Sequence, residues 1–323
     1  MIAALFPLLF GQLSPAGVRG RLSILIFHRV LPKPDPLFDD IPDVVRFEEQ
    51  MRWVARWFNV LPLAEAVVRL RAGALPARAL AITFDDGYAD NATVAAPLLR
   101  RLGLTATFFV TTGVLGGGRM WNDSVVEAVR RAPEGPMELS PLGLGRFMLA
   151  DAASRRAAVE QVIGAIKRRP YAERHELVQR IAETVGVPLP DDLMMSADQV
   201  RQLRSLGMDV GGHTVTHPIL RSLDDAAAER EIAGGREDLV QIIGGPIELF
   251  AYPNGVPGVD YDARHVAMVQ RCGFKAAVST AHGAAAPGAD PFQLPRFTPW
   301  DRGQARYGLR MAGNLMRAEF AVA

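Results

Sequence analysis

One short stretch constrains the fold of this chain more than any other: an apolar run that ends in two acidic residues. Residues 79–84 (Ala-Leu-Ala-Ile-Thr-Phe) have the composition of a buried β-strand, and Asp85, Asp86 and Gly87 follow directly. Adjacent carboxylates at a strand end repel each other unless a cation lies between them or the two groups have different roles. The alternative interpretation is an Asp-Asp-Gly turn, because Asp-Gly is common in hairpins.

Strand-like and helix-like segments alternate along the chain. We predict strands over residues 22–27, 79–84, 105–111, 208–212, 247–252, 274–279 and 292–294. Apolar residues at helical spacing predict helices over residues 47–58, 64–70, 93–102, 197–206, 226–243 and 262–272. Strand, helix and strand joined by short links are typical of parallel pairing. About seven such pairs predict an α/β barrel, in which the carboxyl ends of the strands share one face.

Residues 116–195 interrupt this alternation after the third predicted strand. A glycine loop at 116–118 leads into helix-like segments near 125–131, 152–168 and 172–185, without a strong strand signal between them. We predict a helical insertion on the loop face of the barrel, without a core of its own. Residues 1–323 are therefore expected to form a single domain.

Composition and cysteine content exclude several classes of protein. The chain has 323 residues, 49% of them hydrophobic, which is enough for a large core. Its net charge of +1 gives no general attraction for nucleic acid, and no basic cluster with interleaved aromatic residues is found. Cys272 is the only cysteine, which rules out an intrachain disulfide and a multi-cysteine zinc site.

The first ten residues (Met-Ile-Ala-Ala-Leu-Phe-Pro-Leu-Leu-Phe) are apolar but do not resemble a secretory signal. They lack a positively charged segment, Pro7 interrupts them, and a bilayer span needs about 20 apolar residues. We expect this arm either to pack on the barrel or to touch a membrane surface. With no other candidate span, a cytoplasmic or membrane-peripheral location is favoured, and the sequence gives no prediction of the oligomeric state.

The residues that could take part in catalysis or metal binding each come just after an apolar run. His28, Asp85 with Asp86, His213 with His217, and Arg296 occupy such positions, so a parallel barrel would bring them to one face. A His-x-x-x-His pair on one helical turn is a common metal motif, but Pro218 disfavours a helix, so we expect a tight loop that ends at His217. A packed or surface role for the two histidines is an equal alternative on their pattern alone.

Together with Asp86, the two histidines would form a site for a divalent metal. Zinc is the default for two imidazoles and one carboxylate, and cobalt, nickel or iron would also fit. Asp85 would then be free to act as a general base on a water molecule activated by the metal. His28 is the candidate proton donor, because histidine is partly protonated near neutral pH; the alternative is an ordinary loop histidine.

The two motifs resemble those of a known superfamily. Thr83-Phe84-Asp85-Asp86-Gly87 and His213-Thr214-Val215-Thr216-His217-Pro218 resemble the first two motifs of the polysaccharide deacetylase (NodB-homology) superfamily, and residues 250–255 are similar to the third. The resemblance implies a distorted (β/α)7 barrel, a divalent metal and removal of acetyl groups from glycans. It also implies that Asp85 is the base and that Asp86, His213 and His217 are the metal ligands.

The chain departs from the superfamily pattern in two places. The third motif lacks the arginine that usually steadies the catalytic carboxylate, and Arg296 after the last predicted strand is the candidate replacement. No late histidine motif supplies the usual acid. Residues 26–30 (Ile-Phe-His-Arg-Val) instead resemble an early strand end of the exopolysaccharide and poly-N-acetylglucosamine deacetylases, which favours His28 as the acid.

We predict an N-acetylated glycan as the partner of this chain and a set of residues that contact it. The candidates are Tyr88, Trp121, Asp123, Tyr252, Pro253 and Arg296. Trp121 would stack on a sugar face, or alternatively anchor the core of the insertion. Two other functions remain open at this point: a catalytically silent glycan-binding or assembly protein on the same barrel, and a non-haem iron oxygenase with the same ligand set.

Overall fold

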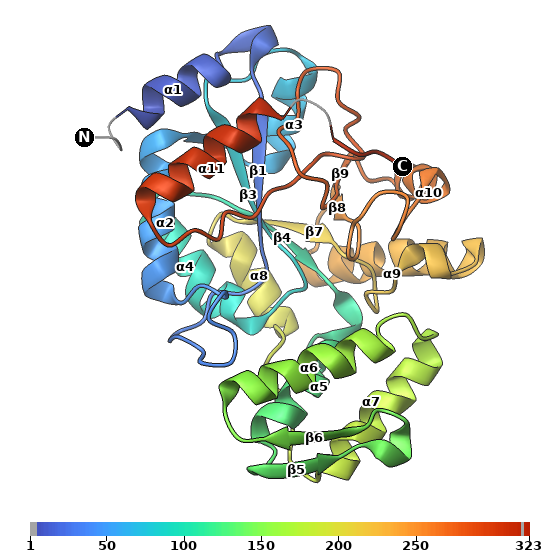
Figure 1. The fold of residues 1–323 in the computed structure, drawn as a ribbon. Helices are drawn as coiled ribbons and strands as arrows, with labels where there is room; N and C mark the ends of the chain where they lie inside the picture. The colour runs from blue at the N-terminus through green and yellow to red at the C-terminus, as the bar shows by residue number, and fades with distance from the viewer. Residues whose placement is uncertain (1–4, 318–319) are drawn as a thin grey trace.

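A curled parallel sheet forms the centre of the molecule (Figure 1). The computed structural model describes residues 5–317 and 320–323. Six strands lie in the order β1 (Leu22–Phe27), β3 (Ala79–Phe84), β4 (Thr107–Val110), β7 (Asp209–Gly212), β8 (Leu249–Ala251) and β9 (Ala276–Val278), and every neighbouring pair is parallel. A short strand, β2 (Asn59–Val60), pairs with the start of β3. All residues of β1 and β3 are buried, as expected for strands covered on both faces.

The seventh position of the barrel is filled by an irregular segment. Leu294 forms a parallel bridge with Val278 of β9, and Phe297 forms one with Leu25 of β1. Pro295 lies between these two residues and cannot donate a ladder hydrogen bond. The segment thus closes the barrel without being a regular strand. The predicted distorted (β/α)7 barrel is confirmed, and its last strand is reduced to these contacts.

Helices cover the outside of the sheet. They are α2 (Val44–Trp57), α3 (Leu63–Arg71), α4 (Ala96–Arg101), α8 (Ala197–Ser205), α9 (Asp225–Ile243) and α10 (Ala263–Arg271), all close to their predicted ranges. A π-helical turn at Asn91–Ala95 precedes α4. One further helix, α11 (Gln304–Met316), was not predicted, and its Tyr307 packs against Trp53 of α2 with ring centroids 5.4 Å apart.

The N-terminal arm forms the helix α1 (Phe6–Leu13), which packs on the barrel. Phe6 lies against Trp57 with ring centroids 4.9 Å apart, and Phe10 stacks on Phe58 at 4.7 Å. The expectation of packing is therefore confirmed for this helix, whereas residues 1–4 of the predicted arm lie outside the described residues. In the part of the chain that the structure describes, no helix is both long and apolar enough to cross a bilayer.

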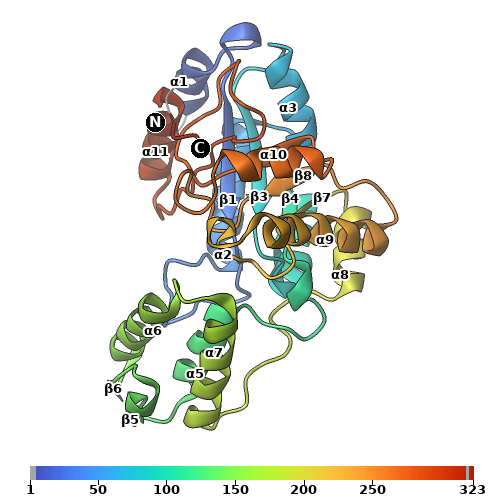
Figure 2. The same ribbon diagram turned by 90° about the vertical axis from the view of Figure 1, so that its right-hand side faces the viewer.

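The insertion forms a separate lobe beneath the barrel (Figure 2). It contains the helices α5 (Trp121–Arg131), α6 (Ala152–Ile166) and α7 (Tyr171–Val185). It also contains an antiparallel hairpin of β5 (Gly135–Glu138) and β6 (Arg146–Leu149). Its buried apolar residues form a cluster distinct from those of the barrel, with Leu149 and Ile181 fully buried. The predicted helical insertion after the third predicted strand is confirmed, but the expectation that it lacks a core of its own is wrong. The hairpin was not predicted, because four-residue strands that include Gly135 and Pro136 give no periodic signal.

Candidate active site

The two acidic residues lie at the carboxyl end of β3, in a turn that sets their directions. Asp86 has φ of 76° and Gly87 has φ of 90°, so the chain takes the left-handed conformation immediately after the strand. The carbonyl of Asp86 accepts a hydrogen bond from the Thr111 amide at 3.2 Å. Because non-glycine residues adopt this conformation at a cost, the surrounding structure must hold Asp86 in place.

The two histidines lie in a tight loop after β7, as predicted. Thr214 and His217 both have positive φ, and the Thr214 hydroxyl accepts a hydrogen bond from the His217 amide at 3.1 Å. The Glu231 carboxylate of α9 accepts hydrogen bonds from the amides of Val215 and Thr216 at 3.0 and 2.8 Å. Glu231 thereby fixes the loop that carries both rings.

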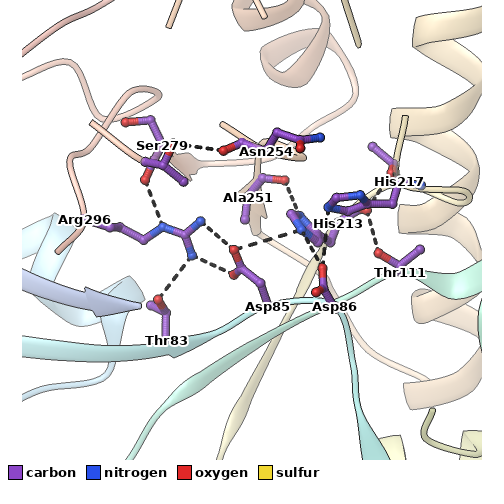
Figure 3. A network of polar contacts seen from close by, with 12 residues as sticks. Thr83, Asp85, Asp86, Thr111, His213, His217, Ala251, Asn254, Ser279 and Arg296 are labelled. Atoms are coloured by element: carbon purple, nitrogen blue, oxygen red, sulfur yellow. Dashed lines mark hydrogen bonds and ion pairs between the residues drawn. The ribbon is translucent and has the colours of Figure 1, made fainter. Parts of the chain in front are cut away.

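Asp86, His213 and His217 converge on one point (Figure 3). The Asp86 Oδ1 atom is 3.4 Å from His213 Nε2 and 3.5 Å from His217 Nε2, and all candidate ligand atoms lie within 4.8 Å of one another. His213 Nδ1 is 2.7 Å from the Ala251 carbonyl oxygen, so Nδ1 carries the hydrogen and Nε2 faces Asp86.

The donor set fits a bound cation. Asp86 Oδ1 is buried without a hydrogen-bond partner among the described residues, and in a neutral His213 the Nε2 lone pair points at this oxygen. Two acceptors facing each other require a proton or a metal ion between them. Burial lowers the pKa of His213, but the Asp85 and Asp86 carboxylates outweigh it and raise this pKa, so this position attracts positive charge. Burial lowers the pKa of His217 to about 4, so this ring is a neutral ligand near neutral pH. Two neutral nitrogens and one carboxylate oxygen are suitable for zinc and similar divalent metals.

Asp85 is paired with Arg296 (Figure 3). Its two carboxylate oxygens each lie 2.6 Å from a guanidinium nitrogen of Arg296, whose Nε donates to the Ser279 carbonyl at 2.9 Å. Both side chains are buried. Burial alone would raise the pKa of Asp85, but Arg296 and His213 outweigh it and hold this pKa below its usual value. Asp85 is therefore ionised, and its Oδ2 lies 4.0 Å from His213 Nε2.

A cavity of about 740 Å³ opens between the strand ends and the insertion. His28, exposed in the loop after β1, lines it together with both acidic residues and both histidines. The backbone of His28 is held by Asn91, whose side-chain amide donates to the His28 carbonyl at 2.9 Å. The five residues with predicted chemical roles thus face one space, which is large enough for a small ligand.

On the insertion side, Asp123 and Tyr88 form the wall of this cavity. The Tyr88 hydroxyl donates to Asp123 Oδ1 at 3.2 Å, and the Arg29 guanidinium lies 4.7 Å from the centre of the Tyr88 ring. The second oxygen of Asp123 is buried without a partner among the described residues. Burial raises the pKa of Asp123 to about 7; the Asp86 charge adds to this effect and the Arg29 charge opposes it.

Three of the predicted substrate-binding residues do not line the cavity. Arg296 is buried behind Asp85, Pro253 is buried, and the Tyr252 ring stacks on Tyr261 at 3.8 Å while its hydroxyl donates to the Phe292 carbonyl. These three side chains do not face the cavity, so the prediction that they contact substrate is wrong. Tyr252 is a packing residue, and Arg296 is the partner of Asp85. Asn254, which follows Pro253, does line the cavity.

Trp121 lies between the cavity and the core of the insertion. It lines the cavity and also packs against the core of the insertion. The Arg174 guanidinium covers one face of its ring, 4.8 Å from the ring centre, so that face is closed to a sugar. The sequence does not indicate Glu231 and Asn91, because neither follows an apolar run and no local pattern marks them. Arg29 lies in the stretch 26–30, where the resemblance indicates a role only for His28.

Comparison with known proteins gives one consistent family. A family model described as polysaccharide deacetylase matches residues 72–140 and 150–277. A curated relative, the putative polysaccharide deacetylase YxkH of Bacillus subtilis (strain 168), is 30% identical over 105 residues, which are 30% of this chain and 34% of the relative. The match thus spans about a third of that relative's length.

Solved structures share the fold at low sequence identity. The Streptococcus pyogenes deacetylase PplD, solved in complex with acetate, has a TM-score of 0.60 and 18% identity, over 91% of this chain and 98% of that one. IcaB from Ammonifex degensii has a TM-score of 0.55 and 20% identity, again over 91% of this chain and 98% of that one. These likenesses establish the barrel architecture.

Proposed function

The chain belongs to the polysaccharide deacetylase family, and on this premise we propose that it hydrolyses acetyl groups, most readily N-acetyl groups, from a sugar in a polysaccharide or a lipid-linked glycan. The observation that carries the proposal is the Asp85–Arg296 pair beside the cluster of Asp86, His213 and His217. An ionised base next to a cation-binding site is the arrangement that amide hydrolysis needs. The barrel and the insertion both line the cavity, and we propose that residues 1–323 act as one catalytic domain.

Asp86, His213 and His217 would hold a divalent metal, with zinc as the default and cobalt, nickel or iron as alternatives. When bound, such an ion polarises a carbonyl oxygen and lowers the pKa of water. The protein's own contribution is to fix the ligands: the Ala251 carbonyl orients His213, and Glu231 holds the loop of His217. Such outer hydrogen bonds typically raise metal affinity.

Asp85 would act as the general base. It accepts a proton from the water molecule whose oxygen attacks the acetyl carbon, while Arg296 keeps the carboxylate in position. The backbone near Tyr88 is the candidate donor to the developing oxyanion. As the bond between carbon and nitrogen breaks, His28 donates a proton to the leaving nitrogen, so that acetate and a free amine are released. His28 suits this role because it lines the cavity and is exposed to solvent.

The glycan would bind between the barrel and the insertion. Tyr88, Asp123 and Trp121 line this space, and the Asp123 carboxyl is the candidate partner of a hydroxyl or amide group of a sugar. The part of the Trp121 ring that lines the cavity would contact a pyranose ring. Asn254 on the barrel side is a further polar candidate.

Acetate release from a panel of acetylated glycans tests the proposed reaction. Asp85→Asn should lower the rate about 100-fold or more, because general-base catalysis contributes about that much. Asp209→Asn is the matched control, since Asp209 lies at the opposite end of the barrel and pairs with Arg204. Full activity of the Asp85 variant would refute its role as base, and glycan binding without any cleavage by the metal-loaded wild type would refute the reaction.

Metal content tests the ligand assignment independently. His213→Ala should lose most of the bound metal, whereas His175→Ala, which removes an exposed histidine of α7, should keep it. Elemental analysis of the purified proteins provides the measurement. An unchanged metal content in the His213 variant would contradict the assignment.

A further inference from the structure

The outer face of α1 carries no charged side chain, and Gln12 is its exposed polar residue. Residues 1–18 contain no Asp, Glu, Lys or Arg. Phe6 and Phe10 point into the barrel, whereas Leu5, Leu8 and Leu9 are 60%, 69% and 37% exposed. Surface helices normally present polar side chains to water, and helices that are apolar on both faces are normally buried on both. Within the described part of the chain, nothing covers the second apolar face of α1.

Helix α11, the neighbour of α1, also carries exposed apolar side chains. It lies beside α1 in both views (Figures 1 and 2), and the ring of Phe6 occupies the space that a Cβ atom at Gly308 would fill. On its outer side, Leu309 and Met316 are 61% and 64% exposed. We call the surface formed by these side chains the α1–α11 face; it consists of Leu5, Leu8, Leu9, Leu309 and Met316.

The ionised residues on the segments that form the α1–α11 face are all basic. Arg19, Arg306 and Arg317 are exposed, and residues 5–21 and 304–317 contain no Asp or Glu. Arg310 of the same helix is paired with Asp301. Arginines at the edge of an apolar surface attract the phosphate groups of anionic lipids. A second copy of the chain docked by two-fold symmetry would instead bring this surface, with its arginines, against itself.

We propose that the α1–α11 face binds the surface of an anionic lipid bilayer. The leucines and Met316 enter the boundary between headgroups and acyl chains, and the three arginines contact lipid phosphates. The helices lie in the plane of the membrane and do not cross it. This interaction depends on neither the metal nor the proposed reaction, so binding can succeed or fail independently of deacetylase activity.

Sedimentation with vesicles tests the proposal. The full chain should sediment with vesicles of phosphatidylcholine containing phosphatidylglycerol, and much less with phosphatidylcholine alone. The double variant Leu8→Gln, Leu309→Gln should bind at least about tenfold more weakly, because two inserted apolar side chains are removed. The variant Arg306→Gln, Arg317→Gln should lose about fivefold per arginine at low salt.

Matched controls distinguish binding through the α1–α11 face from nonspecific adsorption of the protein to vesicles. Met148→Gln replaces an apolar side chain of β6 that is 60% exposed, and Arg168→Gln replaces an exposed arginine after α6, both in the insertion. Both controls should bind like the wild type, and all variants should keep the wild-type melting temperature because the substituted side chains are exposed. Equal binding by the leucine variant and the wild type would overturn the proposal. So would failure of the wild type to bind anionic vesicles, or a dimer in solution that the leucine variant dissociates.

Discussion

The two walls of the active-site cavity are built in different ways. On the barrel side, Asp85, Asp86 and His213 are each fixed by the end of a strand and by a specific partner. On the insertion side, Trp121 and Asp123 lie on a helix that belongs to a separate apolar cluster. The barrel wall holds charges that must keep their positions for the chemistry, whereas the insertion wall contributes shape and one unpartnered carboxyl oxygen.

We expect this difference in construction to correspond to a difference in function between the two walls. The side chains proposed to do the chemistry come from loops anchored in a sheet whose strands are buried on both faces, so they resist displacement. The insertion wall rests on its own core and hairpin, and substitutions there can change the shape of the cavity without disturbing the strands. We therefore expect the barrel wall to set the rate and the insertion wall to set the choice of glycan.

The largest effect should follow from breaking the buried ion pair of the barrel wall. Arg296→Met leaves the Asp85 charge buried without its partner, which should cost about 3–5 kcal/mol of unfolding free energy and abolish acetate release. Arg296→Lys should recover part of the stability but lose the bidentate contact. Denaturant unfolding and acetate release measure the two effects. Wild-type stability in the Met variant would show that the pair is not held as tightly as its geometry indicates.

A substitution in the core of the insertion should leave the barrel intact. Ile181→Ala removes a fully buried side chain of the insertion cluster and should cost about 3 kcal/mol locally. Hydrogen exchange should then increase in α5, α6 and α7 but not in β1 or β3, with a raised KM and a nearly unchanged kcat. Faster exchange throughout the barrel would mean that the two walls unfold as one unit.

The Asp123 carboxyl should make stability depend on pH. Its pKa of about 7 in the folded state lies above the ordinary value of 3.8, so the stabilisation is present below pH 3.8 and is lost as the pH rises through 7. In metal-free protein the loss between pH 5 and pH 7 should be about 2 kcal/mol, and Asp123→Asn should remove it. Thermal unfolding of both proteins across this range provides the measurement. Parallel pH profiles would contradict the raised pKa.

The smallest effect is expected at Glu231, which supports the barrel wall from behind. Glu231→Gln keeps the size of the side chain but weakens its hydrogen bonds to the amides of Val215 and Thr216. Metal affinity should fall about tenfold, with little change in stability. Titration with a competing chelator measures this change. Glu229→Gln on the same helix is the control, because Glu229 pairs with Arg271, which lies outside the site.

Several parts of the site could be predicted because local sequence determines them. Asp85, Asp86 and the histidine pair follow apolar runs, and parallel strands bring such positions to one edge. The pairing of Asp85 with Arg296 joins residues 211 positions apart, and no local pattern predicts it. The absence of an arginine from the third motif only makes Arg296 a candidate. Tyr252 follows β8, which is buried on both faces, so the sequence does not show which side chains at this strand end face the cavity. Glu231 lies in a helix with many charged residues, and nothing local distinguishes it.

The closing segment between Leu294 and Phe297 has a consequence for biosynthesis. The ribosome makes Asp85 211 residues before Arg296, and at 5–20 residues per second this interval lasts roughly 10 to 40 s. During that time a partly folded nascent sheet lacks both its last position and the cation that offsets the burial of Asp85. The buried Asp85–Arg296 pair therefore forms only when the barrel closes, so the last part of the barrel to be made completes the position of the proposed base.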